Sequence, residues 1–317
     1  MPRIVLVHGI GHEHRSAQQA EALEATWRGH LAEGLRRGGY DGFAQELCRD
    51  ERTPSGITVR LAFYGDCFRR PGQMGLVPDR FDATQLELAE HLARIWLTQG
   101  AERASDPRDR QLAARELSLL AGMIGQSQGP RSVVRSAVAG LAHLKFFARA
   151  GMALSERLVL RTLAQVTTYF TDEQVRTTAL TRVKDLLGPE TVALVGHSLG
   201  SVVAFEAAHQ LEIPLPLMIT LGSPLGLRTV IYDRLRPQPP TFPPQVRRWV
   251  NVADRDDLVA AEPNLTGLFG ASAHPRAVFE GGWTVDNGSS PHDAGFYLAR
   301  AETGRPVGQT LSQRRQF

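Results

Sequence analysis

Short, uninterrupted runs of branched aliphatic residues recur along the chain, and a glycine follows each of the first four, either directly or after one intervening residue. Such runs are typical of parallel strands that are buried on both faces, and glycine suits tight strand-to-helix turns. The runs predict strands at Ile4–Val7, Ile57–Phe63, Val192–Val195, Leu217–Leu221, Val246–Val252 and Arg276–Phe279. Helical periodicity fills the spaces between them, as in Ala17–Arg37 and Ser201–Leu211. This alternation predicts an α/β fold with a mostly parallel central sheet flanked by helices.

The region between Tyr64 and Thr191 departs from this alternation, because it contains helical periodicity and no convincing strand. Candidate helices, separated by Gly, Pro or Asp breaks, are Thr84–Gln99, Arg108–Gly122, Arg131–Ala150, Ala153–Phe170 and Asp172–Leu187. We therefore predict that residues 1–65 and 188–317 form the sheet-containing core and that residues 66–187 form a helical insertion or cap.

The segment Arg131–Leu160 is the most apolar part of this predicted insertion, and it carries basic residues at Arg131, Arg135, Lys145 and Arg149. The favoured interpretation is a helical hairpin that buries its apolar face against the sheet domain. Peripheral contact with a membrane, the wall of an apolar substrate channel and a partner interface are the alternatives.

Charged residues are spread along the whole chain. The 36 basic and 33 acidic residues give a net charge of +3, and all but two of the basic residues are arginines. No block of five or six like charges occurs, which argues against a nucleic-acid-binding surface. The two cysteines, Cys48 and Cys67, are too few for a disulfide framework and predict reduced, partly buried thiols.

Neither a leader nor a membrane span is predicted. The apolar run at Ile4–Val7 is shorter than the core of a signal peptide, and no run approaches the roughly 18 apolar residues of a transmembrane helix. The expected location is cytoplasmic.

The segment TVALVGHSLGSVVAFEAA, Thr191–Ala208, places Ser198 at the centre of a Gly-x-Ser-x-Gly motif. The pentapeptide is short enough to arise by chance, so its surroundings decide its meaning. A catalytic serine of this kind occupies a strained turn between an apolar strand and a helix, and the glycines, here Gly196 and Gly200, leave room around it. Both flanking elements are predicted, so Ser198 is the candidate nucleophile.

A serine hydroxyl needs a histidine base and an acid that orients the base. Three histidines follow Ser198, namely His209, His274 and His292. His209 falls on the helix after the serine and His274 precedes the last predicted strand, whereas His292 follows that strand in a loop rich in Gly and Ser. Because catalytic residues lie at the carboxyl ends of the strands, His292 is the candidate base and His274 the alternative.

The candidate acids are Asp254, Asp256 and Asp257, which follow the fifth predicted strand within four positions. Their spacing alone does not choose among them. At least one is expected to be buried against His292, where a carboxylate would hold the useful tautomer of the imidazole and stabilise the imidazolium.

The sequence His8-Gly9-Ile10-Gly11 directly follows the first predicted strand. Gly9 and Gly11 allow the backbone to approach a substrate. The backbone amides of Ile10 and Leu199, the residue after the nucleophile, are therefore the predicted donors to an oxyanion.

No metal or cofactor is predicted. His8, His12, Glu13 and His14 cluster in this first glycine-rich turn, but their spacing matches no common zinc site. No dinucleotide fingerprint follows a strand, and there is no phosphate-binding loop.

Five segments together resemble the α/β-hydrolase superfamily and, within it, the lipase-like and esterase-like serine hydrolases. They are VLVHGIG (residues 5–11), VALVGHSLGSVVA (192–204), LGSPLGL (221–227), WVNVADRDDLVA (249–260) and SPHDAGFY (290–297). The resemblance covers about residues 1–64 and 190–300, and it implies an α/β-hydrolase fold. Lipase-like relatives carry their acid in an Asp-x-Val context after a tryptophan and an asparagine, so the resemblance favours Asp257, with Asp254 as the alternative.

Two departures limit what the resemblance implies. The first predicted strand begins almost at residue 1, so we expect the sheet to lack the two antiparallel edge strands of larger relatives and to be reduced at its N-terminal edge. The large helical region precedes the nucleophile strand rather than following it, so the selectivity of standard lids does not transfer to this chain.

Together these features predict a serine hydrolase that cleaves a small-molecule or lipid-like carboxylic ester through an acyl-enzyme on Ser198. A serine peptidase or an acyltransferase would use the same three residues, because the acyl acceptor depends on the shape of the pocket and on water exclusion. The alternative from another class is an inactive hydrolase fold that serves as a protein-interaction module.

Overall fold

The computed structural model describes residues 1–49, 56–69, 81–124, 129–148, 152–260, 262–270 and 275–315. Its sheet consists of β1 (Arg3–Val7), β2 (Thr58–Ala62), β3 (Thr191–His197), β4 (Leu215–Leu221), β5 (Val246–Asp254) and β6 (Val278–Val285). The strand order is β2-β1-β3-β4-β5-β6, and every neighbouring pair is parallel. The predicted α/β class with a parallel sheet is confirmed.

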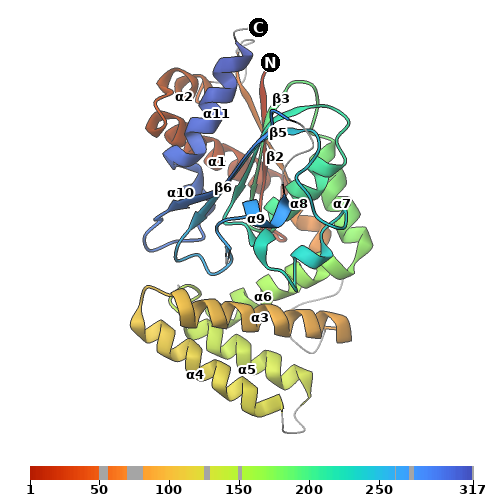
Figure 1. Cartoon of the computed structure of the whole chain (residues 1–317), viewed down its shortest axis with the longest axis vertical. Coiled ribbons are helices and arrows are strands. Elements are labelled where there is room, and N and C mark those ends of the chain that lie inside the picture. The colour runs from red at the N-terminus through yellow and green to blue at the C-terminus, as the bar shows by residue number, and fades with distance from the viewer. Residues whose placement is uncertain are drawn as a thin grey trace.

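Helices cover both faces of the sheet (Figure 1). One face carries α1 (Ala17–Arg37), α2 (Asp41–Leu47), α10 (Ala294–Leu298) and α11 (Ala301–Arg314), and the other carries α7 (Glu173–Lys184), α8 (Leu199–His209) and α9 (Thr266–Phe269). Side chains of β1 alternate between the two faces of the sheet: Ile4 and Leu6 join the core under α1, whereas Val5 and Val7 join the core under α8. Burial on both faces explains why the strands read as continuous apolar runs.

Four helices, α3 (Ala83–Arg103), α4 (Pro107–Ile124), α5 (Pro130–His143) and α6 (Met152–Thr171), lie beyond the carboxyl ends of the strands (Figure 1). They correspond to the helical region expected between the second and third strands. Their apolar side chains form one continuous core with the α8 face of the sheet. The domain boundaries at residues 65 and 187 stay predictions.

Helix α5 packs against α3 and α4 and buries Val133, Val134 and Leu141. The apolar segment 131–160 was expected to bury its apolar face against the sheet domain, whereas α5 packs mainly against the neighbouring helices α3, α4 and α6. Leu154 and Leu158 of α6, however, are 54% and 37% exposed, so part of the segment presents apolar side chains at the surface. In the part of the chain that the structure describes, no helix is long and apolar enough to cross a membrane.

The helix predicted to run from Arg131 to Ala150 is shorter than expected. Helix α5 ends at His143, and the backbone becomes extended at Leu144. Two adjacent phenylalanines lie in the following turn, and the centroids of their rings are 4.8 Å apart. The ring of Phe147 contacts Trp96 of α3, and that of Phe146 lies 6.0 Å from the ring of His292.

Strand β6 starts and ends later than the predicted Arg276–Phe279. Gly281 and Gly282 interrupt the apolar pattern within it. A side chain at Gly281 would overlap the backbone of Thr266, so the glycine allows close packing with α9 rather than ending the strand. The sequence analysis also missed α2 and the C-terminal α11, whose pattern is interrupted by Pro306.

Helices α6, α7 and α8 are joined by a buried ion pair between Arg176, which is 3% exposed, and Glu206, which is fully buried. Tyr169 donates to Glu206 at 2.7 Å, and the backbone amide of Arg236 donates to it at 2.9 Å. Arg176 also donates to the carbonyl of Arg234 at 2.8 Å. Every charge in this cluster has a partner, as burial requires.

Both cysteines are free thiols. Cys67 is partly buried as predicted, whereas Cys48 is exposed, which the sequence analysis did not expect. Burial raises the pKa of Cys67 to about 12, so it is a protonated thiol at neutral pH.

Candidate active site

Ser198 links the end of β3 to the start of α8 in a strained conformation. Its φ of 54° makes it the only non-glycine residue in the described ranges with a positive φ. Its amide donates to the carbonyl of Leu221 at 3.0 Å, and its own carbonyl accepts from the amide and hydroxyl of Ser201 at 2.9 and 2.6 Å. These bonds hold the turn that was predicted from the strand and helix around the motif.

The motif glycines leave room for this turn. A Cβ atom on Gly196 would lie 2.6 Å from the carbonyl oxygen of Gly200. One on Gly200 would overlap the carbonyl oxygen of His8, and one on Gly9 would lie 2.7 Å from the Cβ of Ser198. The loop after β1 and the turn after β3 therefore touch at atomic distance, which only glycine permits at these positions.

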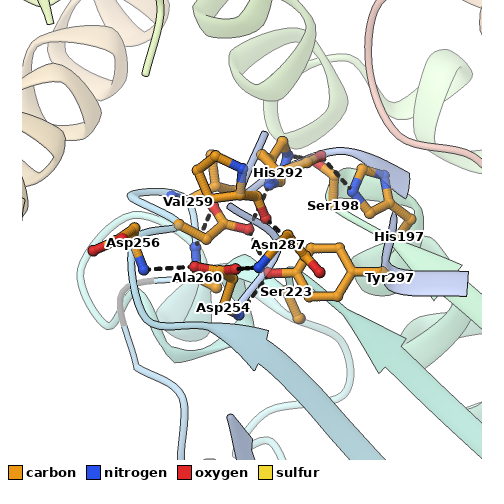
Figure 2. Close-up of polar contacts among 12 residues, drawn as sticks. His197, Ser198, Ser223, Asp254, Asp256, Val259, Ala260, Asn287, His292 and Tyr297 are labelled. Atoms are coloured by element: carbon orange, nitrogen blue, oxygen red, sulfur yellow. Dashed lines mark hydrogen bonds and ion pairs between the residues drawn. The ribbon is translucent and has the colours of Figure 1, made fainter. Parts of the chain in front are cut away.

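His292 lies beside Ser198 in the loop between β6 and α10 (Figure 2). Its Nε2 is 2.9 Å from Ser198 Oγ, and its Nδ1 is 2.7 Å from Asp257 Oδ2. With the proton on Nδ1, the ring donates to Asp257 and accepts from the serine hydroxyl. The structure thus brings the three predicted residues into one hydrogen-bond chain.

Asp257 is buried, and both of its oxygens are fully engaged. Oδ2 accepts from His292 and from the hydroxyl of Tyr297 at 2.8 Å. Oδ1 accepts from the backbone amides of Val259 and Ala260 at 2.9 and 3.4 Å. Four donors satisfy the carboxylate, which is the condition for burying an ionised acid.

Asp254 is equally buried but faces away from the histidine. Its carboxylate accepts from the backbone amides of Asp256, at 2.7 Å, and of Asn287. Burial raises the pKa of Asp254 above its usual value. Of the acids left open by the sequence, Asp257 alone contacts His292, whereas Asp254 shapes the loop around it.

Two further residues position the chain of hydrogen bonds, and sequence reasoning assigned neither of them a role. Tyr297, on α10, accepts from the amide of Asp254 at 2.7 Å and donates to Asp257. His197 Nε2 donates to the carbonyl of His292 at 3.0 Å, and the two imidazoles lie 4.8 Å apart. Burial lowers the pKa of His197 well below its usual value, so its ring is neutral. Its place just before the nucleophile, on a buried strand, is the signal that marks it in the sequence.

The loop after β1 is fixed by His8 and Tyr64. His8 Nδ1 donates to the carbonyl of Gly9 at 2.6 Å, and Nε2 accepts from the amide of Tyr64 at 3.1 Å. The Tyr64 hydroxyl donates to the carbonyl of His8 at 2.6 Å. Burial, helped by the nearby His12, lowers the pKa of His8 to about 3, so it is a neutral structural residue.

Helix α6 holds the same loop from the other side. Gln165 accepts from the amide of Gly11 at 2.9 Å and donates to Glu13 at 2.6 Å. Glu13 also forms an ion pair with Arg161 at 2.8 Å. The helical region between β2 and β3 therefore supports the segment that follows Ile10, a contribution that the sequence pattern did not reveal.

The predicted oxyanion donors lie on this loop and at the start of α8. Leu199 is the first residue of α8, where a backbone amide has no acceptor within the helix. Ile10 lines the same cavity as Ser198. Gly11, with a φ of 85°, turns the chain immediately after Ile10. The roles of the two amides stay predictions.

Ser198 and His292 open into a cavity of about 400 Å³ between α1, α6 and the loops at the carboxyl ends of the strands. Much of its wall is apolar, from Ile10, Leu23, Trp27, Phe146, Phe147, Leu158, Val259 and Ala294. Its polar lining comes from His12, Arg15, Thr26, His30, Thr162, His197 and Asp293. A mostly apolar cavity with a few polar groups and this volume suits a small ligand.

Two other histidines, His209 and His274, follow Ser198 in the sequence. His209 lies at the end of α8, where its Nε2 donates to the carbonyl of Thr241 at 2.9 Å. His274, the alternative base, lies outside the described residues. Within the described ranges, no group of three or more His, Cys, Asp or Glu side chains could hold a metal ion.

Comparison with known proteins adds no family assignment. No protein-family model matches the chain, and neither the curated proteins nor the solved structures contain a significant match. The functional interpretation therefore depends on the sequence resemblance and on the geometry of the cavity and its hydrogen-bond chain.

Proposed function

We propose that this protein is a serine hydrolase with an α/β-hydrolase fold that cleaves a small carboxylic ester through an acyl-enzyme on Ser198. The observation that carries the proposal is the unbroken hydrogen-bond chain from Ser198 through His292 to Asp257. Its serine stands on a strained strand-to-helix turn and faces a cavity, as the chemistry requires. In this proposal, helices α3–α6 are an insertion that closes the cavity.

Acylation would begin when Ser198 Oγ attacks the ester carbonyl. His292 Nε2, 2.9 Å away, takes the hydroxyl proton as the new C–O bond forms. Asp257 holds Nδ1–H and stabilises the imidazolium. The negative charge on the former carbonyl oxygen would be received by the amides of Ile10 and Leu199.

Collapse of this tetrahedral species would break the bond to the leaving alcohol, which takes its proton from His292 Nε2. Water then enters, gives its proton to the same nitrogen and attacks the acyl carbonyl. The second collapse releases the carboxylic acid and returns the proton to Ser198 Oγ. One histidine thus serves both halves of the reaction, as base and then as acid in each.

The enclosure of the serine supports a small ester rather than a folded polypeptide as substrate. Ser198 is only 4% exposed, and Phe146, Leu158 and Thr162 from the helical region wall its cavity. A polypeptide would have to pass these side chains in an extended form. A peptidase or an acyltransferase would use the same residues, so the identity of the acyl acceptor is part of the test.

The test is labelling with a fluorophosphonate probe, which phosphonylates an activated serine. Wild-type protein should incorporate one equivalent at Ser198, Ser198→Ala should incorporate none, and His292→Ala should react far more slowly. Ser289→Ala, which removes an exposed hydroxyl in the loop that carries His292, is the matched control and should label like the wild type.

Folded wild-type protein that stays unlabelled would refute the proposal. Where labelling occurs, hydrolysis of nitrophenyl esters with acyl chains of increasing length measures the size of the pocket. Adding an alcohol or an amine to the same assay, and measuring how the acyl group divides between it and water, identifies the acceptor.

A further inference from the structure

Arg15 lines the cavity that contains Ser198, and it is half-buried there. Its Nε donates to His12 Nδ1 at 2.8 Å, which fixes the plane of the guanidinium. In the part of the chain that the structure describes, no carboxylate pairs with it. Its remaining N–H donors are thus oriented but have no anionic partner, which is an unfavourable state for a half-buried cation.

The acidic residue nearest to Arg15 in sequence is engaged elsewhere. Glu13 is bound by Arg161 and Gln165, and Arg69 donates to the carbonyls of Glu13 and Arg15. The neighbouring His12 is no counter-ion either, because burial and the charge of Arg15 lower its pKa to about 4 and leave it neutral. This wall of the cavity therefore has a net positive charge.

The acid on the cavity wall, Asp293, is also occupied. Its carboxylate accepts from the backbone amides of Gly295 and Phe296 at 2.9 and 3.2 Å and so caps α10. A Cβ atom on Gly295 would contact the side chains of both Asp293 and His30. Asp293 therefore lies on the side of the cavity that His30 of α1 lines. The carboxylate is therefore fixed by α10 and is not the partner of Arg15.

We propose that Arg15 binds a carboxylate or phosphate of the substrate, at a distance from the ester bond that Ser198 attacks. The inference rests on the proposed function and narrows it, because the substrate becomes a small anionic ester. Half-esters of dicarboxylic acids and esters of carboxylated or phosphorylated alcohols fit this description. The apolar side chains that line the cavity would contact the hydrocarbon part, and a neutral fat would leave Arg15 unpaired.

The experiment compares anionic and neutral esters in matched pairs. For the acyl side, the pair is mono-4-nitrophenyl glutarate and 4-nitrophenyl valerate. For the alcohol side, 4-acetoxybenzoate and 4-acetoxyphenyl phosphate are compared with methyl 4-acetoxybenzoate. The measured quantity is the ratio of kcat/KM between the anionic and the neutral ester, in the wild type, Arg15→Gln, Arg15→Lys and the control Arg157→Gln. Arg157 is an exposed cation of α6 that does not line the cavity.

In the wild type, the ratio should be about tenfold or more in at least one pair, because charge-assisted hydrogen bonds to arginine favour the anion. Arg15→Gln should bring this ratio close to one, mainly through KM, and Arg15→Lys should retain part of it. Arg157→Gln should keep the wild-type ratio. Added salt should lower the rate for the anionic ester alone.

A wild-type ratio near one in every pair would overturn the inference, and so would an equal loss for anionic and neutral esters in Arg15→Gln. The proposed function would survive both results, since neutral esters would still be cleaved and the fluorophosphonate would still label Ser198. A wild-type protein that cleaves no ester and takes no label would overturn both proposals.

Discussion

Replacing Asp257 by asparagine should stop turnover by reversing the tautomer of His292. Oδ1 of Asp257 accepts from the amides of Val259 and Ala260, so the amide oxygen of an asparagine must remain at that position. Its Nδ2 then takes the place of Oδ2 and points its hydrogens at His292 Nδ1 and the hydroxyl of Tyr297. Nδ1 must become an acceptor, which places the ring proton on Nε2.

In that tautomer, Nε2 faces Ser198 Oγ as a donor and cannot take the serine proton. We expect kcat/KM to fall by about 10³- to 10⁴-fold, the loss known for this change in a protease triad. The loss corresponds to roughly 4 to 5.5 kcal/mol of transition-state stabilisation. The fold should persist, because the bonds to the two loop amides are kept, and the free energy of unfolding should change by only about 1 kcal/mol.

The matched control is Asp254→Asn, an identical change three residues away in the same strand end. Asp254 accepts from the amides of Asp256 and Asn287 and does not contact His292. It should lose about 1 to 3 kcal/mol of stability, because an asparagine Nδ2 must face one of those amides, and less than tenfold in kcat/KM. Ester hydrolysis measures kcat/KM, the rate of fluorophosphonate labelling measures the reactivity of Ser198, and urea denaturation measures the free energy of unfolding.

The reasoning is refuted if Asp254→Asn causes the large loss of activity, or if Asp257→Asn retains kcat/KM within tenfold of the wild type. Loss of activity in both variants together with a lowered unfolding midpoint would mean that the loop, rather than the tautomer, had been damaged.

Three further predictions concern the surroundings of the site. Gln165→Leu should lower kcat by about tenfold or more with the fold intact, since it frees the amide of Gly11 beside the predicted oxyanion donor; an unchanged kcat would show that α6 does not position this loop. His8 has a pKa of about 3, below the 6.5 of the unfolded chain, so the unfolded state binds more protons between these values and stability falls as the pH drops from 6.5 towards 3. Through this residue, each unit of pH decrease lowers the free energy of unfolding by up to about 1.4 kcal/mol. In urea denaturation, the stability of His8→Gln should therefore depend less steeply on pH than that of the wild type. Arg176→Met should lower the free energy of unfolding by about 3 to 5 kcal/mol in the same assay, because it leaves the charge of Glu206 buried without its cation. The double variant Arg176→Met/Glu206→Leu should recover part of the loss, and equal stability of the single and the double variant would contradict this.

Local sequence was sufficient for the sheet and for the turn at Ser198. Strands such as β1 and β3 are buried on both faces, so burial appears as an unbroken apolar run that any local reading detects. The strained serine was equally visible, because its strand, its glycines and its helix are contiguous in the chain. Gly9 was also predicted to lie close to the substrate, and the structure places it against Ser198.

Sequence patterns were less informative where one segment packs against a distant one. Helix α5 ends before Phe146 and Phe147, whose rings lie near His292 and Trp96 respectively, and no periodicity in residues 131–150 records these contacts. Strand β6 continues through Gly281 because α9 packs closely there, whereas isolated glycines normally weaken a strand.

By itself, then, the sequence determined the α/β class, the strained serine and the order of candidate residues after it. Only the tertiary structure decided which aspartate forms a hydrogen bond with His292, since Asp254 and Asp257 both lie at the carboxyl end of β5 and are equally buried. Asp257 is bound by His292, in the loop after β6, and by Tyr297, on α10, which are 35 and 40 residues away in the chain. The support of the β1 loop by Gln165, across 154 residues, has the same origin. Side-chain contacts between segments far apart in the chain depend on how the helices and loops pack, and a periodic pattern within one segment carries no record of them.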